Sequence, residues 1–220
     1  MKAQRKAYDE ADELPPLVPV AVLARIRTAV SKFNRAQATA VEELIKLKED
    51  AAAEAVEKEQ HRFALGAALQ FGKRTHLSSL NHFDAHVQHS PFTKNGAMKV
   101  GKSEIKFKVN GSLVPHSILM HPPQKSRSQV RYPLNGNWTA FRASVGVPTI
   151  DEKKDPGSAL TFEVLGDGES LWKSNPVTKR DTFQPCAVRV EKVKALTLRV
   201  HCAGTHDWAR AVWVEPFLAE

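Results

Sequence analysis

Closely spaced histidines are the residues of this sequence that could bind a metal ion or transfer protons. His82, His86 and His89 follow one another at i, i+4 and i+7, and on a helix these spacings would place three imidazoles on one face, as in zinc sites. As a strand, residues 82–88 alternate apolar and polar side chains, with Pro91 close behind. The alternation favours a strand with a polar outer face, so we expect no metal site in this segment.

A second pair of histidines flanks a short apolar run in PHSILMHPP, residues 115–123. If residues 117–120 form a strand, His116 and His121 lie five positions apart and point to opposite faces, which makes them a poor pair of metal ligands. The double proline after His121 ends strand pairing. We expect His116 to be a polar residue of a turn or the surface, and His121 to lie where the strand leaves the sheet.

Sequence signatures of catalysis are missing. There is no G-x-S-x-G motif, and the glycines stand in sequences typical of hairpin turns, not of phosphate-binding loops. The GDG at 166–168 predicts a hairpin turn with positive φ, and the alternative is a carboxylate that binds a structural Ca²⁺. We therefore expect a protein that is not an enzyme and that has no cofactor other than this Ca²⁺.

The excess positive charge is concentrated in one block. The 220 residues carry a formal net charge of +8, and residues 94–131 hold eight Lys or Arg against a single Glu. Such a block attracts anionic polymers through counterion release, and the alternative is a solvated face that keeps the protein in solution. No apolar run is long enough to cross a membrane, and no signal peptide is visible in the first residues.

Residues 1–72 predict a helical arm. Between Val20 and Leu65 there is neither Gly nor Pro, and a new apolar stripe after Ala51 predicts a second helix that folds back and ends near Gly72. The two helices form either an intramolecular hairpin or a coiled coil that drives self-association. The seam of the first helix consists of Leu23, Ile26, Val30, Phe33, Gln37, Ala40, Leu44, Leu47 and Ala51, and the stripe of the second consists of Ala52, Val56, Phe63 and Ala67.

From about residue 75 to residue 220 the pattern predicts an antiparallel β-sandwich or barrel. Short alternating runs, such as Leu160–Leu165 and Leu196–Val200, are separated by turn sequences rich in Gly, Asn and Asp. Many short strands at this spacing are typical of all-β domains. The chain is therefore expected to consist of a helical arm over 1–72 and a β domain over 75–220.

The two cysteines, Cys186 and Cys202, bracket a predicted hairpin. If its turn is centred near Lys194, the alternating apolar residues of the two arms face one another, and Cys186 lies directly opposite Cys202, within reach of a disulfide. A disulfide would favour an oxidising, extracytoplasmic compartment. The alternative is two buried free thiols.

All four tryptophans belong to the predicted β domain. Indole rings stack on the apolar faces of sugars, but the core of a sandwich also needs large aromatic residues. The sequence leaves both roles open for Trp138, Trp172, Trp208 and Trp213.

Five ordered segments of the β domain resemble the NPCBM family of carbohydrate-binding modules. They are LSSL at 77–80, HSILMHPP at 116–123, VRYPLNGNWTAFRASVGV at 130–147, LTFEVLGDGESLWKS at 160–174 and ALTLRVHCAGTHDWARAVWV at 195–214. The resemblance implies a galactose-binding-like β-sandwich of jelly-roll type that binds galactose-containing or related glycans without catalysis. The helical arm before it resembles large bacterial proteins of the planctomycete type.

The resemblance also implies a set of ligand-binding residues. Motif positions of the family fall on His121, Asp167, Asp207 and Trp208. Of these, we expect His121, Asp207 and Trp208 to bind the ligand, together with Trp138 at the aromatic position of a further motif. Aromatic residues are scarce, so a shallow site for a terminal sugar fits better than a broad stacking platform. Two alternatives remain, an interaction module whose helices drive assembly and a module that binds an anionic polymer through residues 94–131. We do not expect nucleic acid as a partner.

Overall fold

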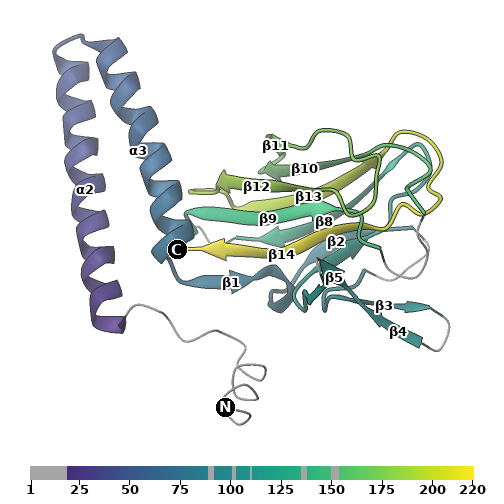
Figure 1. Cartoon of the computed structure of the whole chain (residues 1–220). Helices are drawn as coiled ribbons and strands as arrows, with labels where there is room; N and C mark the ends of the chain where they lie inside the picture. The colour runs from purple at the N-terminus through teal and green to yellow at the C-terminus, as the bar shows by residue number, and fades with distance from the viewer. Residues whose placement is uncertain (1–18, 89–91, 101–102, 110, 135–137, 150–153) are drawn as a thin grey trace. The chain divides into compact units, whose positions relative to one another are not determined.

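The computed structural model describes residues 19–88, 92–100, 103–109, 111–134, 138–149 and 154–220. The chain divides into two units, residues 1–64 and residues 65–220, and the division falls inside the second helix (Figure 1). No helix formed by the described residues combines the length and the apolar composition that a membrane crossing requires.

The first unit is a hairpin of two helices, α2 (Val20–Lys46) and α3 (Asp50–Phe71). Pro19 immediately precedes α2, where its fixed φ suits the start of a helix, and Lys48 reverses the chain with a φ of 61°. The rings of Phe33 and Phe63 touch, with centroids 4.7 Å apart. Contacts between residues so distant in sequence require the helices to lie side by side, so the predicted hairpin is confirmed.

The buried face of α3 coincides only in part with the predicted stripe, of which Ala67 is buried and Val56 is half-buried. Ala53 and Ala64 are buried, whereas Ala52 and Phe63 are exposed. Small side chains let two helix axes approach closely, and the larger Phe63 ring packs beside that contact. No residue of α2 is buried, and Phe33 of its seam remains 47% exposed.

The second unit is a sandwich of two antiparallel sheets. In sheet A the strand order is β1 (Arg74–His76), β14 (Ala211–Ala219), β9 (Ala140–Gly146) and β12 (Phe183–Arg189), with β7 (Ile118–Met120) also paired to β14. In sheet B the order is β11 (Glu169–Lys173), β10 (Leu160–Gly166), β13 (Ala195–Cys202), β8 (Arg127–Pro133) and β2 (Phe83–His86). Shorter elements are η1 (Leu77–Ser79) and the paired strands β3 (Ala97–Val100) with β4 (Ser103–Lys106) and β5 (Lys108–Val109) with β6 (Ser112–Leu113).

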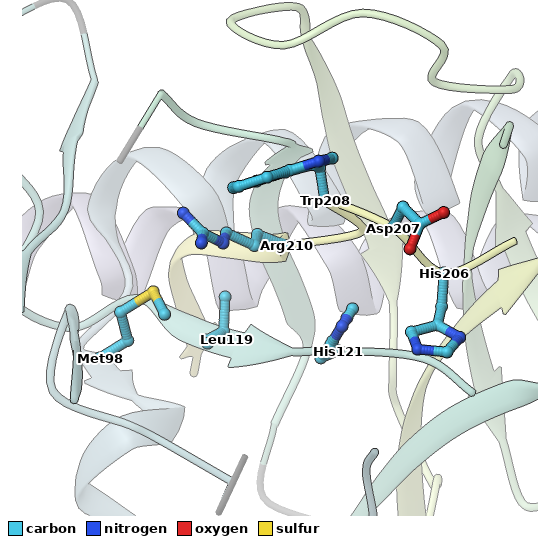
Figure 2. A pocket seen from close by; sticks show the side chains of 7 residues that line it. All are labelled: Met98, Leu119, His121, His206, Asp207, Trp208 and Arg210. Atoms are coloured by element: carbon cyan, nitrogen blue, oxygen red, sulfur yellow. The ribbon is translucent and has the colours of Figure 1, made fainter. Parts of the chain in front are cut away.

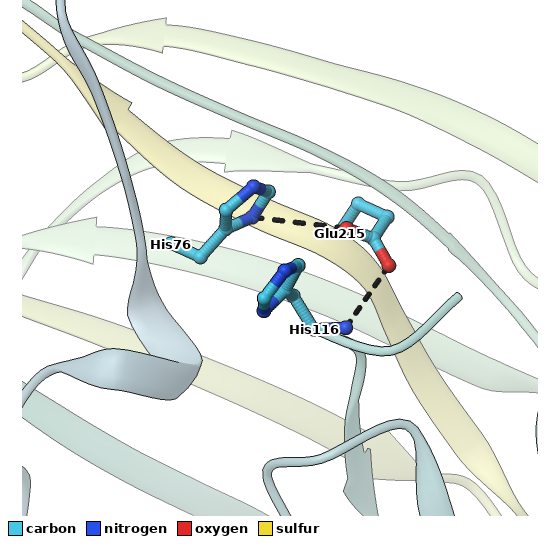
Figure 3. A group of neighbouring side chains, drawn as sticks. All are labelled: His76, His116 and Glu215. Carbon is cyan, nitrogen blue, oxygen red and sulfur yellow. Dashed lines mark hydrogen bonds and ion pairs between the residues drawn. The ribbon is translucent and has the colours of Figure 1, made fainter. Parts of the chain in front are cut away.

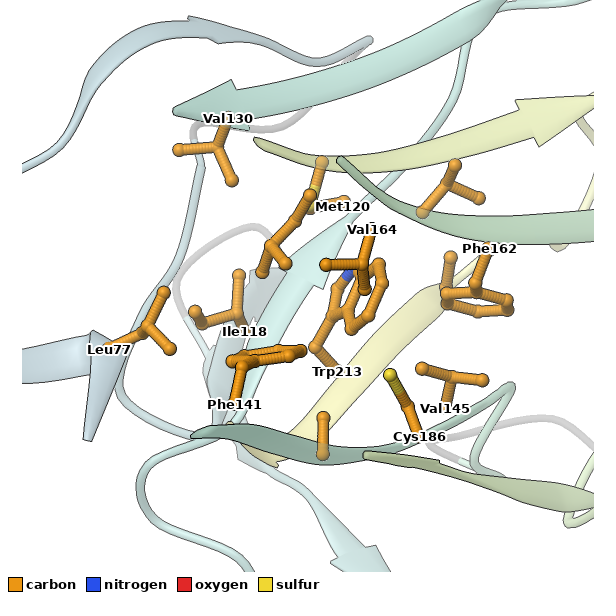
Figure 4. Packing of buried hydrophobic residues seen from close by; sticks show 14 of the residues in the cluster. Leu77, Ile118, Met120, Val130, Phe141, Val145, Phe162, Val164, Cys186 and Trp213 are labelled. Atoms are coloured by element: carbon orange, nitrogen blue, oxygen red, sulfur yellow. The ribbon is translucent and has the colours of Figure 1, made fainter. Parts of the chain in front are cut away.

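The core lies between the two sheets. Trp213 of β14, Phe141 of β9 and Phe162 of β10 are fully buried and meet near its centre (Figure 4). The Trp213 ring centroid lies 5.4 Å from that of Phe162 and 6.3 Å from that of Phe141. Trp213 is therefore a core residue, and the predicted mainly β sandwich preceded by a helical hairpin is confirmed.

The GDG sequence forms the predicted turn between β10 and β11. Asp167 and Gly168 have φ values of 51° and 96°, as a two-residue hairpin turn requires. The Asp167 carboxylate accepts hydrogen bonds from the backbone N–H groups of Lys194 (3.1 Å) and Ala195 (2.8 Å). The aspartate thus joins this turn to the start of β13.

The two cysteines belong to different sheets. β12, which carries Cys186, pairs with β9 in sheet A, whereas β13, which carries Cys202, lies between β10 and β8 in sheet B. The chain crosses between the sheets at residues 190–194 and does not turn back as a hairpin. Both cysteines are buried free thiols, and burial raises the pKa of the Cys186 thiol. The predicted cross-strand disulfide is wrong.

The segment that contains His82 and His86 forms an exposed edge strand, β2. Its ladder with β8 is irregular, and Asp84 has a φ of 50°. The irregularity leaves every residue of β2 exposed, including Phe83, whose ring lies 5.1 Å from the Arg131 guanidinium carbon. The predicted strand forms, but Phe83 and Ala85 on its apolar side are exposed, and Val87, just after the strand, packs partly buried against the core. His89 lies outside the described residues.

Two smaller apolar clusters lie on the side of sheet A away from the core. The first consists of Met98, Phe107, Val114, Leu119, Val212 and Val214, and the second of Ala68, Ala140, Phe217 and Ala219, with Leu65 and Leu69 of α3 packed against it. Between them the register of β14 with β9 shifts from Val214 to Phe217, and Glu215 has a φ of 46°. β14 therefore bulges between the two clusters.

Candidate functional site

A pocket of about 380 Å³ lies where β3, the end of β7 and the loop between β13 and β14 meet (Figure 2). Its apolar side is formed by Met98 and Leu119, and its polar side by loop residues. The described residues that line it are Met98, Leu119, His121, His206, Asp207, Trp208 and Arg210.

The loop between β13 and β14 is held by short-range hydrogen bonds. The backbone N–H of Ala209 donates to the His206 carbonyl (3.1 Å), and that of Arg210 donates to the Trp208 carbonyl (2.7 Å). Trp208 has a φ of 56°, a conformation that costs free energy for a bulky side chain. Such strain persists where surrounding contacts hold it, and it is concentrated at binding sites.

His121 is oriented by this loop. Its Nδ1 lies 3.0 Å from the Ala209 carbonyl, and because a carbonyl only accepts, the ring carries its proton on Nδ1. In the neutral ring the lone pair then lies on Nε2, which is a hydrogen-bond acceptor. The His206 ring lies at 5.5 Å in an edge-to-face arrangement.

The Trp208 indole lies beside two cations. The Arg210 guanidinium carbon is 4.9 Å from the ring centroid, and the Lys154 Nζ is 4.5 Å from it. These contacts orient the ring and place positive charge next to it. Figure 2 shows the indole over the Arg210 side chain, with the Asp207 carboxylate beside them.

Gly157 supports the loop from a neighbouring segment. Its backbone N–H donates to the Asp207 carbonyl (2.8 Å). A Cβ at this position would lie 2.6 Å from Thr205 Oγ1 and 3.2 Å from the Asp207 Cβ. Only a residue without a side chain permits this close approach.

Three of the four predicted ligand-binding residues, His121, Asp207 and Trp208, line the same pocket. Trp138 does not line it. The pocket loop joins β14 at Ala211, whereas Thr139 bonds to Ala219, eight residues or about 26 Å along the strand. Trp138 packs partly buried against the main core, outside this pocket, and its contact with a ligand stays a prediction.

Four of the residues that line the pocket were not predicted from the sequence. His206 and Arg210 flank the Asp-Trp pair in the sequence HDWAR, so they could have been predicted as pocket residues from their closeness to that pair in the chain. Met98 and Leu119 reach the pocket through tertiary packing, which no local pattern reports.

The basic block 94–131 is divided between different parts of the second unit. Lys94 Nζ donates to the Leu80 carbonyl (2.8 Å), and Arg131 lies 3.8 Å from an Asp84 oxygen. Lys125 and Arg127 line a different pocket, of about 580 Å³. Lys102 lies outside the described residues.

Solved structures share the fold of the second unit. The CBM51 of Clostridium perfringens GH95, in complex with methyl-galactose, is 22% identical with a TM-score of 0.54, over 67% of this chain and 100% of that chain. The CBM51-2 and INT domains of Clostridium perfringens ZmpB, in complex with GlcNAc, are 21% identical with a TM-score of 0.55, over 67% of this chain and 32% of that chain.

A curated relative shows a more limited overlap. A Renibacterium salmoninarum protein named "Putative endo-alpha-N-acetylgalactosaminidase" is 30% identical over 111 residues, which are 48% of this chain and 7% of that protein. The chain thus corresponds to a small part of that relative's length.

The family match covers the sandwich. The NPCBM/NEW2 domain profile matches residues 73–219, from the start of the sheets to the end of β14, and leaves residues 1–72 outside. This range is well over half of the chain and contains every described residue that lines the pocket. The chain therefore belongs to the NPCBM/NEW2 domain family.

Proposed function

We propose that the second unit is a non-catalytic carbohydrate-binding module whose pocket holds one terminal sugar, with galactose-configured sugars preferred. The observation that carries the proposal is the convergence of His121, Asp207, Trp208 and Arg210 around one pocket of about 380 Å³. Modules of the same fold have been solved in complex with methyl-galactose and with GlcNAc, which supports a monosaccharide as the ligand.

Each polar group of the pocket matches a part of a pyranose. The Trp208 indole offers an apolar surface for the C–H face of the sugar ring once Lys154 or Arg210, which both lie over the ring, moves aside. The Asp207 carboxylate accepts hydrogen bonds from hydroxyls, the Arg210 guanidinium donates to them, and His121 Nε2 accepts one more. In galactose the axial 4-hydroxyl leaves one C–H face uninterrupted, so stacking and hydrogen bonding can occur together.

The composition of the pocket favours binding without bond cleavage. Glycoside hydrolysis ordinarily uses two carboxyl groups on either side of the scissile bond. Asp207 is the one carboxylate among the described residues that line the pocket. The pocket therefore fits a recognition site better than a hydrolytic one.

Calorimetric titration of the full chain with methyl-galactoside, GlcNAc and methyl-mannoside tests the proposal. We expect one saturable site for methyl-galactoside, and a loss of at least about tenfold in affinity in Trp208→Ala and in Asp207→Asn, because truncations at the centre of a binding site are costly. Trp138→Phe is the matched control and should bind like the parent. No saturable binding to these sugars or on a broad glycan array would contradict the proposal.

The salt dependence of the same titrations separates neutral from acidic ligands. Affinity for a neutral sugar should be nearly constant between low and physiological salt. Affinity that falls steeply with salt indicates instead an anionic glycan held by residues of the basic block.

Self-association through the helices is a second candidate function, favoured by the apolar surface of α2. Val20 at the start of α2 and Ile45 near its end are 73% and 55% exposed, Leu47 directly after the helix is 72% exposed, and no α2 residue is buried. A second copy would cover this surface, and two linked modules would bind a multivalent glycan with higher avidity. Light scattering should give a dimer or larger assembly for the full chain and a smaller mass after Ile45→Lys with Leu47→Lys. A monomer at high concentration would refute it.

A further inference from the structure

His76, His116 and Glu215 come together from three segments that are distant in the sequence (Figure 3). His76 ends β1, His116 lies in the turn before β7, and Glu215 lies in the bulge of β14. The candidate ligand atoms of the three side chains all lie within 4.8 Å of one another. In the part of the chain that the structure describes, no other three His, Cys, Asp or Glu residues meet this criterion.

The carboxylate is fixed in a position that serves both histidines. Glu215 Oε1 accepts a hydrogen bond from the backbone N–H of His116 (3.0 Å), and Oε2 lies 3.8 Å from His76 Nδ1. Ser78 Oγ lies 3.2 Å from His116 Nδ1, which leaves Nε2 of this ring as the second coordinating atom.

Two further features concern the burial of His76 and the backbone of Glu215. His76 Nδ1 is buried and has no hydrogen-bond partner among the described residues, which is costly for a polar atom. Glu215 adopts a φ of 46°, a strained conformation for this residue, at the bulge that presents its carboxylate. A bound ion would occupy the position that His76 Nδ1 and the Glu215 carboxylate face.

The two imidazoles are stacked, with centroids 4.1 Å apart and planes 15° from parallel. In the stacked arrangement the in-plane lone pairs do not converge on one point. Rotation of the His116 ring about its Cβ–Cγ bond, a broad torsion, would be needed to bring Nε2 to the ion, and it would move Nδ1 away from Ser78 Oγ.

We propose that His76, His116 and Glu215 form a binding site for a zinc-like divalent cation, with water as the fourth ligand. Two imidazole nitrogens and one carboxylate oxygen suit Zn²⁺ and similar transition metals, whereas Ca²⁺ and Mg²⁺ prefer oxygen ligands throughout. The ion would connect the edge strand β1, the bulge of β14 and the turn before β7. It shares no residue with the sugar pocket.

Titration of the full chain, free of any polyhistidine tag and stripped with EDTA, tests the proposal. We expect about one Zn²⁺ per chain, and a rise in Tm of about 5–10 °C when free Zn²⁺ is a hundredfold above its Kd. Mg²⁺ and Ca²⁺ at the same concentration should leave the Tm unchanged. Bound Co²⁺ should give visible absorption of the kind produced by nitrogen and oxygen ligands.

Variants separate this site from adventitious zinc binding. Glu215→Gln retains an oxygen acceptor for the His116 N–H, so the fold should persist by circular dichroism while Zn²⁺ affinity falls at least about tenfold. His116→Ala should lose affinity to a similar extent. The matched control is His201→Ala, which removes a histidine paired with Glu163 in sheet B and should leave Zn²⁺ binding intact. A parent that binds no Zn²⁺, or affinity unchanged in Glu215→Gln and His116→Ala together, would overturn the proposal.

Discussion

At the scale of single residues, the shape of the sugar pocket depends on backbone positions as much as on the polar side chains that line it. Trp208 is held at positive φ, and Gly157 permits the approach of the segment that bonds to the Asp207 carbonyl. Neither position touches the core between the sheets. Changes there should alter ligand binding more than stability.

Gly157→Ala tests this separation. The added Cβ would lie 2.6 Å from Thr205 Oγ1, so the binding loop must shift, and methyl-galactoside affinity should fall about tenfold. The Tm should change by no more than about 2–4 °C, the effect of about 1 kcal/mol in a domain of this size. Gly66→Ala is the control, because a Cβ there meets no atom within 4 Å. Unchanged affinity in Gly157→Ala would contradict this role.

Glu163 provides a pH-dependent contribution to stability. Burial alone would raise its pKa, but hydrogen bonds from His201 and Ser170 and the positive charges of His201 and Arg199 lower it overall. Its carboxylate lies 2.8 Å from His201 Nε2 and 3.3 Å from an Arg199 nitrogen.

Because the pKa is lowered on folding, the stabilisation is present above the unfolded pKa of about 4.3 and is lost as pH falls through the lower folded value. Glu163→Gln should therefore reduce the free energy of unfolding by about 1–3 kcal/mol at pH 7 and by less below pH 4. Urea unfolding at the two pH values measures this. A destabilisation that is equal at both would contradict the assignment.

At the scale of elements, local patterns predicted most strands but not their partners. The turn at Asp167 and Gly168 was predictable because only residues that tolerate positive φ fit it. That β12 and β13 belong to different sheets was not predictable. A strand shows the same alternation of apolar and polar residues whether the next strand pairs with it or crosses to the opposite sheet. The edge position of β12 does explain why Pro185 is tolerated in it.

The crossing between sheets has a chemical consequence for the two thiols. Both cysteines should react with a thiol reagent only after denaturation, because they are buried and burial raises the pKa of Cys186. Two thiols per chain should then be titrated without a reducing agent, and dithiothreitol should leave the Tm unchanged. Fewer than two thiols in the denatured, unreduced chain would contradict the strand arrangement.

The two candidate sites also differ in how far the sequence could predict them. Asp207 and Trp208 are adjacent in the chain, and the resemblance to a family identified them together with His121. The group of His76, His116 and Glu215 spans the whole sandwich in sequence. Only the pairing of β1 and β7 with β14 brings these residues together, so no spacing rule could identify them.

At the scale of the whole molecule, the C-terminal end of α3 packs against the sandwich. Leu65, Ala68 and Leu69 pack on Phe217 and its alanine neighbours, although the family match begins only at residue 73. A chain cut at the family boundary therefore loses part of an apolar cluster.

Residues 73–220 should be less stable than residues 50–220, which retain all of α3. Exposure of Phe217 and its neighbours should cost on the order of 2 kcal/mol, or about 4–8 °C in Tm for a domain of this size. Thermal unfolding followed by circular dichroism compares the two chains. Equal Tm values would indicate that α3 contributes nothing to the sandwich.

The pairing of the first and last strands of the sandwich determines how such a module can be combined with others. Arg74 faces Ala219 in the β1–β14 ladder, and the Glu220 N–H donates to the Lys73 carbonyl (3.1 Å). The chain thus enters and leaves the sandwich at neighbouring points. A unit with adjacent ends can be inserted into a surface loop of a host protein with short linkers and little distortion, or be circularly permuted. The fold is suited to transfer between larger proteins as an intact insertion.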